Sequence, residues 1–213
     1  MKGKISILFD WKSMGIQAYI PMMAMVLLFL YTLTVKDALP FIIPALEYVT
    51  PIFSAWWSIF LFYDLLEEPG SETIFTYPVS RWKLGVVRVG VFFLFYVLLL
   101  EILLFAIEKW TAPGIWEPMS VQLIAESYFF CGLGFLAMAM TMNTGWSLMF
   151  PIVYSSTQIL TKGALLPVVN IYAFNQEPLT WDELPAVVFK SVLLGTVFIG
   201  GAQYLIHHMR RFH

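Results

Sequence analysis

The sequence is short of charge. Only 12% of its 213 residues are charged, against about a quarter in a soluble globular domain, whereas 60% are hydrophobic. The hydrophobic residues occur in long runs, and a run of about 18 or more with few charges can cross a bilayer as a helix. A formal net charge of −2 offers no basic surface for nucleic acid. The composition therefore predicts an integral membrane protein with lipid around it and no nucleic-acid partner.

The sequence also lacks the motifs of several kinds of catalytic and metal site. Its single cysteine, Cys131, lies within a hydrophobic run, which excludes an internal disulfide and predicts a buried packing role. There is no G-x-x-x-x-G-K-[ST] phosphate-binding loop, no H-E-x-x-H zinc motif and no G-x-S-x-G nucleophile motif. His207, His208 and His213 indicate a solvated basic tail rather than a metal site. We therefore expect no catalytic residue, metal or cofactor in this chain.

Six hydrophobic segments are expected to form transmembrane helices, because backbone groups in lipid must be hydrogen-bonded within the segment. Their approximate bounds are residues 17–35, 43–65, 84–107, 121–142, 146–160 and 186–207. The first segment is interpreted as a retained helix rather than a signal peptide, since further spans follow it and no cleavage pattern closes it. The predicted fold class is an all-α integral membrane protein, with residues 1–213 as a single six-helix domain.

The distribution of lysine and arginine predicts the orientation of the helices, since cytoplasmic loops carry an excess of both. Four positive residues fall on one side, namely Lys36, Lys109, Lys162 and Lys190. Eight fall on the other, namely Lys2, Lys4, Lys12, Arg81, Lys83, Arg88, Arg210 and Arg211. Both termini and the 66–83 loop are therefore expected in the cytoplasm. The segment 161–185 lies outside, either as a folded extracellular cap or with short helices that re-enter the membrane.

Residues 1–16 are weakly amphipathic. One stripe at helical spacing is polar and comprises Ser6, Asp10, Ser13 and Gln17. Another is apolar and comprises Ile5, Leu8, Phe9 and Ile16. With lysines nearby to contact anionic headgroups, this pattern predicts a helix lying in the inner membrane interface, and a disordered tail is the alternative.

The stretch EEPGSETIFTYPVSRWK, residues 67–83, is a polar loop that carries large apolar side chains. A Pro-Gly step breaks the chain after the second span, Ser71 can cap a new helix, and Pro78 ends it. A helix of one to two turns remains, over about residues 72–76. The loop is thus predicted to form a short, stiff helical segment rather than a flexible linker, and docking of its apolar side chains is favoured over their exposure.

The apolar face of this short helix must therefore dock elsewhere. Ile74 and Tyr77 are three positions apart and share a face, and burying one such side chain is worth roughly 1.5–3 kcal/mol. The face is expected to dock either on the membrane surface or on a cytoplasmic partner. After it, Ser80 can cap the third span, with Arg81, Lys83 and Arg88 as anchors at the headgroups.

The stretch resembles the cytoplasmic loop of permease subunits of ABC exporters of the ABC-2 type. In that family, acidic residues, a Gly-Ser/Thr-Glu step, an apolar helix and a Pro-x-Ser-Arg end lie between the second and third of six spans. The matching residues are Glu67, Glu68, Gly70, Ser71, Glu72, Ile74, Phe75, Pro78, Ser80 and Arg81, with Tyr77 on the same face. One departure is Val86 after Gly85, where a lysine commonly stands, and Arg88 is a possible substitute.

The resemblance implies that this loop is a coupling helix, which fits a groove on a separate ATP-binding subunit. It further implies a complex of two such ATPase subunits, which bind ATP and magnesium, with two permease chains that are identical or related. The complex would lie in the plasma membrane of a bacterial cell. The chain itself would not be an enzyme, and its cargo would be an amphipathic peptide antibiotic, drug or lipid.

Polar residues within the predicted spans are candidates for a translocation path, because intramembrane carboxylates are costly and usually face protein or water. The candidates are Glu101, Glu126, Tyr154, Ser155 and Gln158. Glu101 is the most deeply embedded, and a purely structural role is its alternative. Glu47 and Glu126 are interpreted as interfacial. An ion-coupled secondary transporter that uses Glu101 and Glu126 is the alternative function.

Small residues in two of the spans predict close helix contacts, since they let helix backbones approach one another. They are Ser127, Cys131, Gly132, Gly134 and Ala137 in the fourth span, and Ser191 and Gly195 in the sixth.

Overall fold

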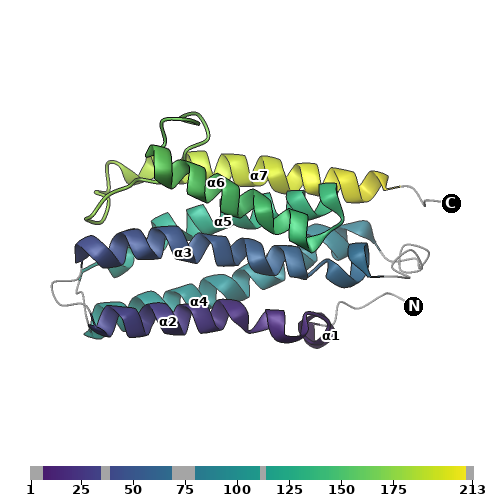
Figure 1. The fold of residues 1–213 in the computed structure, drawn as a ribbon, viewed down its shortest axis with the longest axis horizontal. Helices are drawn as coiled ribbons and strands as arrows, with labels where there is room; N and C mark the ends of the chain where they lie inside the picture. The colour runs from purple at the N-terminus through teal and green to yellow at the C-terminus, as the bar shows by residue number, and fades with distance from the viewer. Residues whose placement is uncertain (1–6, 35–38, 69–79, 111–113, 210–213) are drawn as a thin grey trace.

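The computed structural model describes residues 7–34, 39–68, 80–110 and 114–209, and within these ranges it contains helices and loops but no strand. The elements are α1 (Ile7–Ser13), a 3-10 turn (Gly15–Ala18), α2 (Ile20–Thr34), α3 (Leu39–Phe60), α4 (Arg88–Trp110), α5 (Trp116–Thr141), α6 (Thr144–Thr161) and α7 (Leu184–His208). The long helices lie roughly side by side (Figure 1). The prediction of an all-α fold is confirmed for the described residues.

Four helices are long and apolar enough to cross a membrane, namely Leu39–Phe60, Lys83–Trp110, Trp116–Thr141 and Leu184–His208. The apolar helix α2 has 15 residues, which corresponds to about 22 Å of helix against a hydrocarbon core of roughly 30 Å. Helix α6 has 18 residues and carries several polar side chains. The four apolar helices are compatible with a multi-pass membrane protein, and the number of six spans stays a prediction.

Helix α5 lies at the centre of the bundle, and 72% of its apolar stretch is buried. Glycines permit its neighbours to come close. A Cβ atom at Gly132 would lie 2.7 Å from the carbonyl oxygen of Gly195 in α7. A Cβ atom at Gly134 would lie 2.5 Å from Oγ of Ser58 in α3. The small residues of α5 and α7 therefore make the close helix contacts that the sequence predicts.

Two π-helical turns stand on either side of residues 69–79. Tyr63–Glu67 continues α3, and the N–H of Glu68 donates to the carbonyl of Tyr63 at 3.1 Å. Lys83–Val87 leads into α4, and Gly85 within it has non-helical backbone angles. The expected coupling helix lies outside the described residues, as do Gly70, Ser71, Glu72, Ile74, Phe75, Tyr77 and Pro78.

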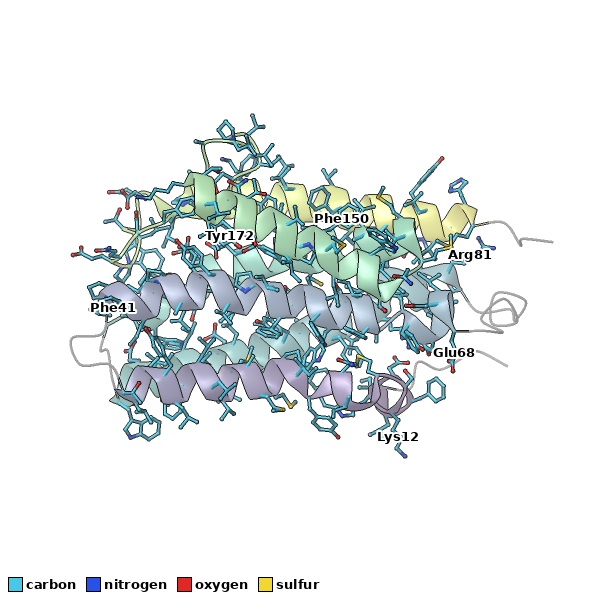
Figure 2. The ribbon with its side chains drawn as sticks, viewed as in Figure 1. Lys12, Phe41, Glu68, Arg81, Phe150 and Tyr172 are labelled. Carbon is cyan, nitrogen blue, oxygen red and sulfur yellow. The ribbon has the colours of Figure 1, made fainter. Side chains whose placement is uncertain are left out.

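The described residues that flank this gap lie at the same end of the bundle as α1. Figure 2 shows Lys12, Glu68 and Arg81 at that end, which we call the α1 end, and Phe41 at the opposite end. Helix α7 also finishes at the α1 end (Figure 1). The loop between α3 and α4, the N-terminal helix and the end of α7 thus share one end of the bundle.

Helix α1 turns its polar stripe toward the protein and its apolar stripe outward. Leu8 and Ile16 are each 76% exposed, whereas Asp10 is buried. The ring of Trp11 contacts the rings of Trp57 and Phe92, at centroid distances of 5.6 and 6.3 Å. An outward apolar face suits a helix that lies against lipid, and the inward acid needs a partner within the protein.

Replacing Gly132 with alanine should lower the thermal stability of the purified protein in detergent. The new methyl group would meet the backbone of α7, and such overpacking costs about 1–3 kcal/mol of the free energy of unfolding. Gly90→Ala in α4 is the matched control, because a Cβ atom there meets nothing within 4 Å. Equal melting temperatures for the two variants would show that α5 and α7 are not in close contact.

Candidate functional site

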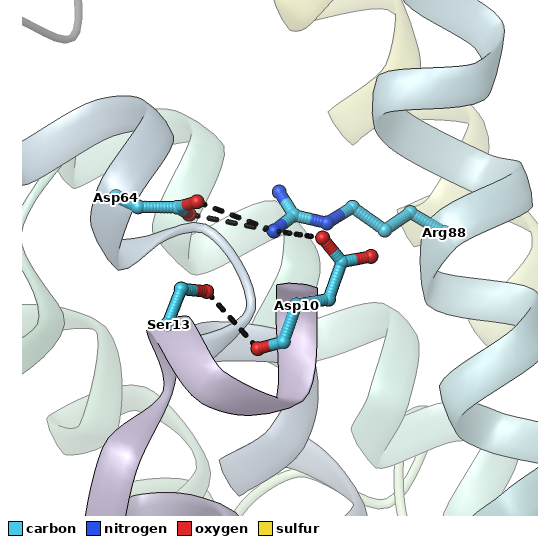
Figure 3. Close-up of polar contacts among 4 residues, drawn as sticks. All are labelled: Asp10, Ser13, Asp64 and Arg88. Carbon is cyan, nitrogen blue, oxygen red and sulfur yellow. Dashed lines mark hydrogen bonds and ion pairs between the residues drawn. The ribbon is translucent and has the colours of Figure 1, made fainter. Parts of the chain in front are cut away.

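Polar side chains form a buried cluster at the α1 end, centred on Arg88 (Figure 3). Arg88 begins α4 and is only 4% exposed. Its Nη2 atom lies 2.9 Å from Oδ1 of Asp10 in α1 and 3.4 Å from Oδ2 of Asp64, in the turn after α3. The prediction that Arg88 anchors the helix at the headgroups is wrong, because these two acids hold its guanidinium inside the protein. Arg88 instead joins three segments of the chain.

One arginine faces two aspartates in this cluster, so it cannot neutralise both at close range. Asp10 has the shorter contact. Burial raises the pKa of Asp64 above its ordinary value, and the charge of Arg88 opposes this rise. A carboxyl whose pKa is raised on folding binds its proton more tightly in the folded state. Its contribution to stability is therefore present at low pH and is lost as the pH rises.

Glu67, a sequence-predicted coupling residue, caps the beginning of α6. Its Oε2 accepts from the backbone N–H of Thr144 at 2.7 Å, and its Oε1 accepts from Nδ2 of Asn143 at 3.0 Å. The first N–H groups of a helix lack partners within it, and the helix dipole favours a negative charge there. Glu67 thus connects the turn after α3 to α6, while the neighbouring Glu68 is exposed.

Arg81, on the other side of the gap, binds the end of α7. Its Nη1 donates to the carbonyls of Ile206 at 3.2 Å, of Met209 at 3.1 Å, and of His207. The last carbonyls of a helix are unpaired and carry its negative dipole end, so a guanidinium is a favourable partner. Ser80 contributes its carbonyl, which accepts from the N–H groups of Lys83 and Leu84.

Gln203 of α7 fits into the irregular turn at Gly85. Its Oε1 accepts from the N–H of Val86 at 3.0 Å, and its Nε2 donates to the carbonyl of Arg81 at 3.2 Å. A Cβ atom at Gly85 would lie only 2.0 Å from Oε1 of Gln203, so glycine is required for this contact. Both stems of the loop between α3 and α4 are therefore bonded to the end of another helix.

A second buried cluster lies at the opposite end and contains two carboxylates. Glu47 of α3 and Glu126 of α5 are each 0% exposed. The Nε2 atom of Gln122 donates to Oε1 of Glu126 at 2.9 Å and to Oε1 of Glu47 at 3.2 Å. Within the described ranges, neither carboxylate has an ion pair, and Oε2 of each has no hydrogen-bond partner. Both carboxylates are fully enclosed by protein, and their interfacial depth in the membrane stays a prediction.

The 162–183 segment, which joins α6 to α7, folds onto this second cluster. Oε1 of Glu47 accepts from the N–H of Ala173 and from that of Phe174 at 3.4 Å. The ring of Tyr172 packs edge-on against Tyr48, with centroids 5.6 Å apart. The segment consists of turns and irregular backbone without a helix, so the alternative of short helices in it is wrong, while its place relative to the membrane stays a prediction.

The polar residues of α6 face the same segment. The hydroxyl of Tyr154 donates to the carbonyl of Val169 at 2.6 Å, and the hydroxyls of Ser155 and Tyr172 are 2.8 Å apart. Nε2 of Gln158 lies 3.4 Å from the carbonyl oxygen of Leu166. These three sequence-predicted path residues therefore fasten the 162–183 segment.

Glu101, the remaining path candidate, has a different set of partners from Glu126. Its Oε2 accepts from Nε1 of Trp116 at 2.7 Å and from Oγ of Ser120 at 3.1 Å, which ties α4 to the start of α5. Sequence reasoning missed Gln122, although its spacing of four positions from Glu126 is the local signal that could have found it. It also missed Tyr172, whose side chain contacts Tyr48 and Ser155, both remote in the sequence.

The described residues contain no group of three or more His, Cys, Asp or Glu that could hold a metal ion. Comparison of the chain with models of known families, with curated proteins and with solved structures gave no match. What the two clusters do must therefore be argued from their geometry.

The pH dependence of stability should change when Asp64 is replaced with asparagine. Because burial raises the pKa of Asp64 above 3.8, the wild type should lose stability relative to Asp64→Asn as the pH rises from about that value. Melting temperatures in detergent across a pH series measure the difference. Asp182→Asn, at an exposed position, is the control and should give no such trend. A difference that grows in favour of the wild type at higher pH would instead show that the pairing with Arg88 dominates.

Replacing Glu47 with alanine should loosen the 162–183 segment, because the partly buried N–H of Ala173 loses its acceptor. The measurement is the rate of thiol labelling at Ile171→Cys, a position that is buried in the parent. The native Cys131 is also buried and should label slowly. We expect faster labelling with Glu47→Ala and an unchanged rate with Glu101→Ala, whose partners lie elsewhere. Equal rates in both variants would show that Glu47 does not hold the segment.

Proposed function

We propose that this chain is the membrane-spanning permease subunit of an ATP-driven exporter of the ABC-2 type. The observation that carries the proposal is the connection of the loop between α3 and α4 to the rest of the bundle. Glu67 on one stem binds the start of α6, and Arg81 on the other binds the end of α7. A loop with such stems is suited to pass a force from outside the chain to several helices at once.

The mechanism follows from these contacts of Glu67 with α6 and of Arg81 with α7. A separate ATP-binding subunit would dock on the face that carries Ile74, Phe75 and Tyr77 and would bind ATP with magnesium. Its closure would displace the two stems, and the displacement would reach α6 through Glu67 and α7 through Arg81. The Asp64–Arg88–Asp10 contacts would carry it to α1. Rigid helices then transmit it to the opposite end, where the buried cluster holds the 162–183 segment.

The proposed assembly contains two permease chains, identical or related, and two ATPase subunits. The loop and α1 would face the cytoplasm of a bacterial cell, and the 162–183 segment would face outward. Tyr154, Ser155, Gln158 and Glu126 would line or close the outer part of the path, and the cargo would be an amphipathic peptide, drug or lipid. Glu101 is assigned the structural role of joining α4 to α5, which its two hydrogen bonds support.

A second candidate function is ion-coupled transport, and one observation favours it. Glu47 and Glu126 are buried together without a cation among the described residues, and intramembrane carboxylates of this kind can carry protons. The pair would then be Glu47 with Glu126, rather than Glu101 with Glu126. Transport driven by a pH gradient in proteoliposomes without ATP would favour this candidate over the ABC-type permease.

Replacing Ile74 or Phe75 with aspartate should uncouple the complex while the membrane helices stay inserted. The charge would have to enter an apolar groove on the partner, at a cost of several kcal/mol, which weakens binding by orders of magnitude. The tagged chain is purified from its own host's membranes, and the co-purifying protein that carries a G-x-x-x-x-G-K-[ST] motif is quantified together with magnesium-dependent ATPase activity. Both should fall in the variants.

The matched control is Phe41→Asp, at an exposed position at the opposite end, which should retain both signals. Normal co-purification and ATPase activity with aspartate at both loop positions would contradict the proposal. ATPase activity intrinsic to the chain would also contradict it, because the sequence lacks the phosphate-binding loop.

A further inference from the structure

A groove runs along the surface between residues 82–86, which lead into α4, and the second half of α7, with a volume of about 490 Å³. Its apolar walls include Val86, Ile199 and Gly200, and its α1 end is formed by Trp82, His207 and His208. The lining positions of α7 extend from Thr196 to His208, which is about 18 Å along the helix axis. This length is close to the depth of one bilayer leaflet, about 15 Å of a roughly 30 Å core.

The floor of the groove is fixed by contacts that leave its surface apolar. Both polar atoms of the Gln203 side chain are bonded, one to the N–H of Val86 and the other to the carbonyl of Arg81. A Cβ atom at Gly200 would meet nothing within 4 Å, so the groove is open at its middle. The position of Gly200 therefore leaves room for an apolar chain to lie against α7.

Two basic residues, Arg81 and Lys83, flank Trp82 at the α1 end of the groove. Lys83 follows Trp82 directly and is exposed, as is Trp82. The carbonyls at the end of α7 would repel an anion, but Arg81 binds three of them and offsets this. In the part of the chain that the structure describes, all ion pairs belong to Arg88, so neither Arg81 nor Lys83 has an acidic partner within that part.

We propose that this groove binds an anionic phospholipid. One acyl chain would lie against Val86, Ile199 and Gly200, and the phosphate would sit at the end formed by Trp82, His207 and His208, within reach of the exposed Lys83 that follows Trp82. Two observations select this occupant over a second copy of the chain. The surface of the groove is mainly apolar, and the exposed Lys83 stands next to one end of it, which matches an acyl chain with an anionic headgroup. Basic pockets between membrane helices favour anionic headgroups in the same way, and an exposed tryptophan is typical of the headgroup region.

The test is lipid binding to the full-length protein in detergent, measured by native mass spectrometry. Phosphatidylglycerol and phosphatidylcholine with identical acyl chains are the probes. We expect tighter binding of phosphatidylglycerol, and Lys83→Ala should weaken it about fivefold, the share of one basic residue near a membrane surface. Binding of phosphatidylcholine should not change. Gly200→Leu fills the groove and should abolish the binding of both lipids, whereas Gly90→Leu, also in open space, should not.

Equal affinities for the two lipids, or unchanged phosphatidylglycerol binding in Lys83→Ala, would overturn the headgroup assignment. Wild-type lipid binding by a folded Gly200→Leu variant would place the lipid elsewhere. If Gly200→Leu lost self-association and kept its lipid, a second copy of the chain would be the occupant. Lys83→Ala changes only an exposed side chain, so its result decides the proposal even if Gly200→Leu does not fold.

Discussion

Backbone groups that are left unpaired where a helix begins, ends or bends are the constraint that organises this structure. In apolar surroundings no water can bond them, and an unsatisfied N–H or C=O costs several kcal/mol. Glu67 is placed on an N–H of α6 and Arg81 on carbonyls of α7. The indole of Trp57 donates to the carbonyl of Ala18, in the break between α1 and α2. Because each such partner comes from another segment, every one of these breaks becomes a joint.

The joints are not alike at the two ends of the bundle. At the α1 end, the charged residues Glu67 and Arg81 make these contacts on the two sides of the loop between α3 and α4. The ion pairs of Arg88 with its two aspartates lie at the same end. At the opposite end they hold a single irregular segment down on α3 and α6, through Glu47 and a row of hydroxyl and amide groups. At the α1 end, the loop between α3 and α4 is therefore bonded to several helices. At the opposite end, the position of the 162–183 segment depends on the helices that hold it.

Spacing along the chain predicted the features that are local. The long helices α4, α5 and α7 lie where the apolar runs are, and the glycines of α5 make the expected contacts. The polar joints could not be predicted in this way, because their partners are remote: Arg81 bonds a residue 125 positions away and Glu67 one 76 positions away. The enclosure of Glu47 by protein also escaped prediction, since it depends on how α3 is rotated about its axis and on the segment that covers it.

The two π-helical turns, Tyr63–Glu67 and Lys83–Val87, have a geometric consequence for the loop that they bracket. A π-helical turn holds one more residue than an α-helical turn. If such a turn changes to α-helix, everything beyond it rotates by about 100° and moves about 1.5 Å along the axis. In each stem of the loop, such a change would therefore couple translation along the bundle axis to rotation about that axis.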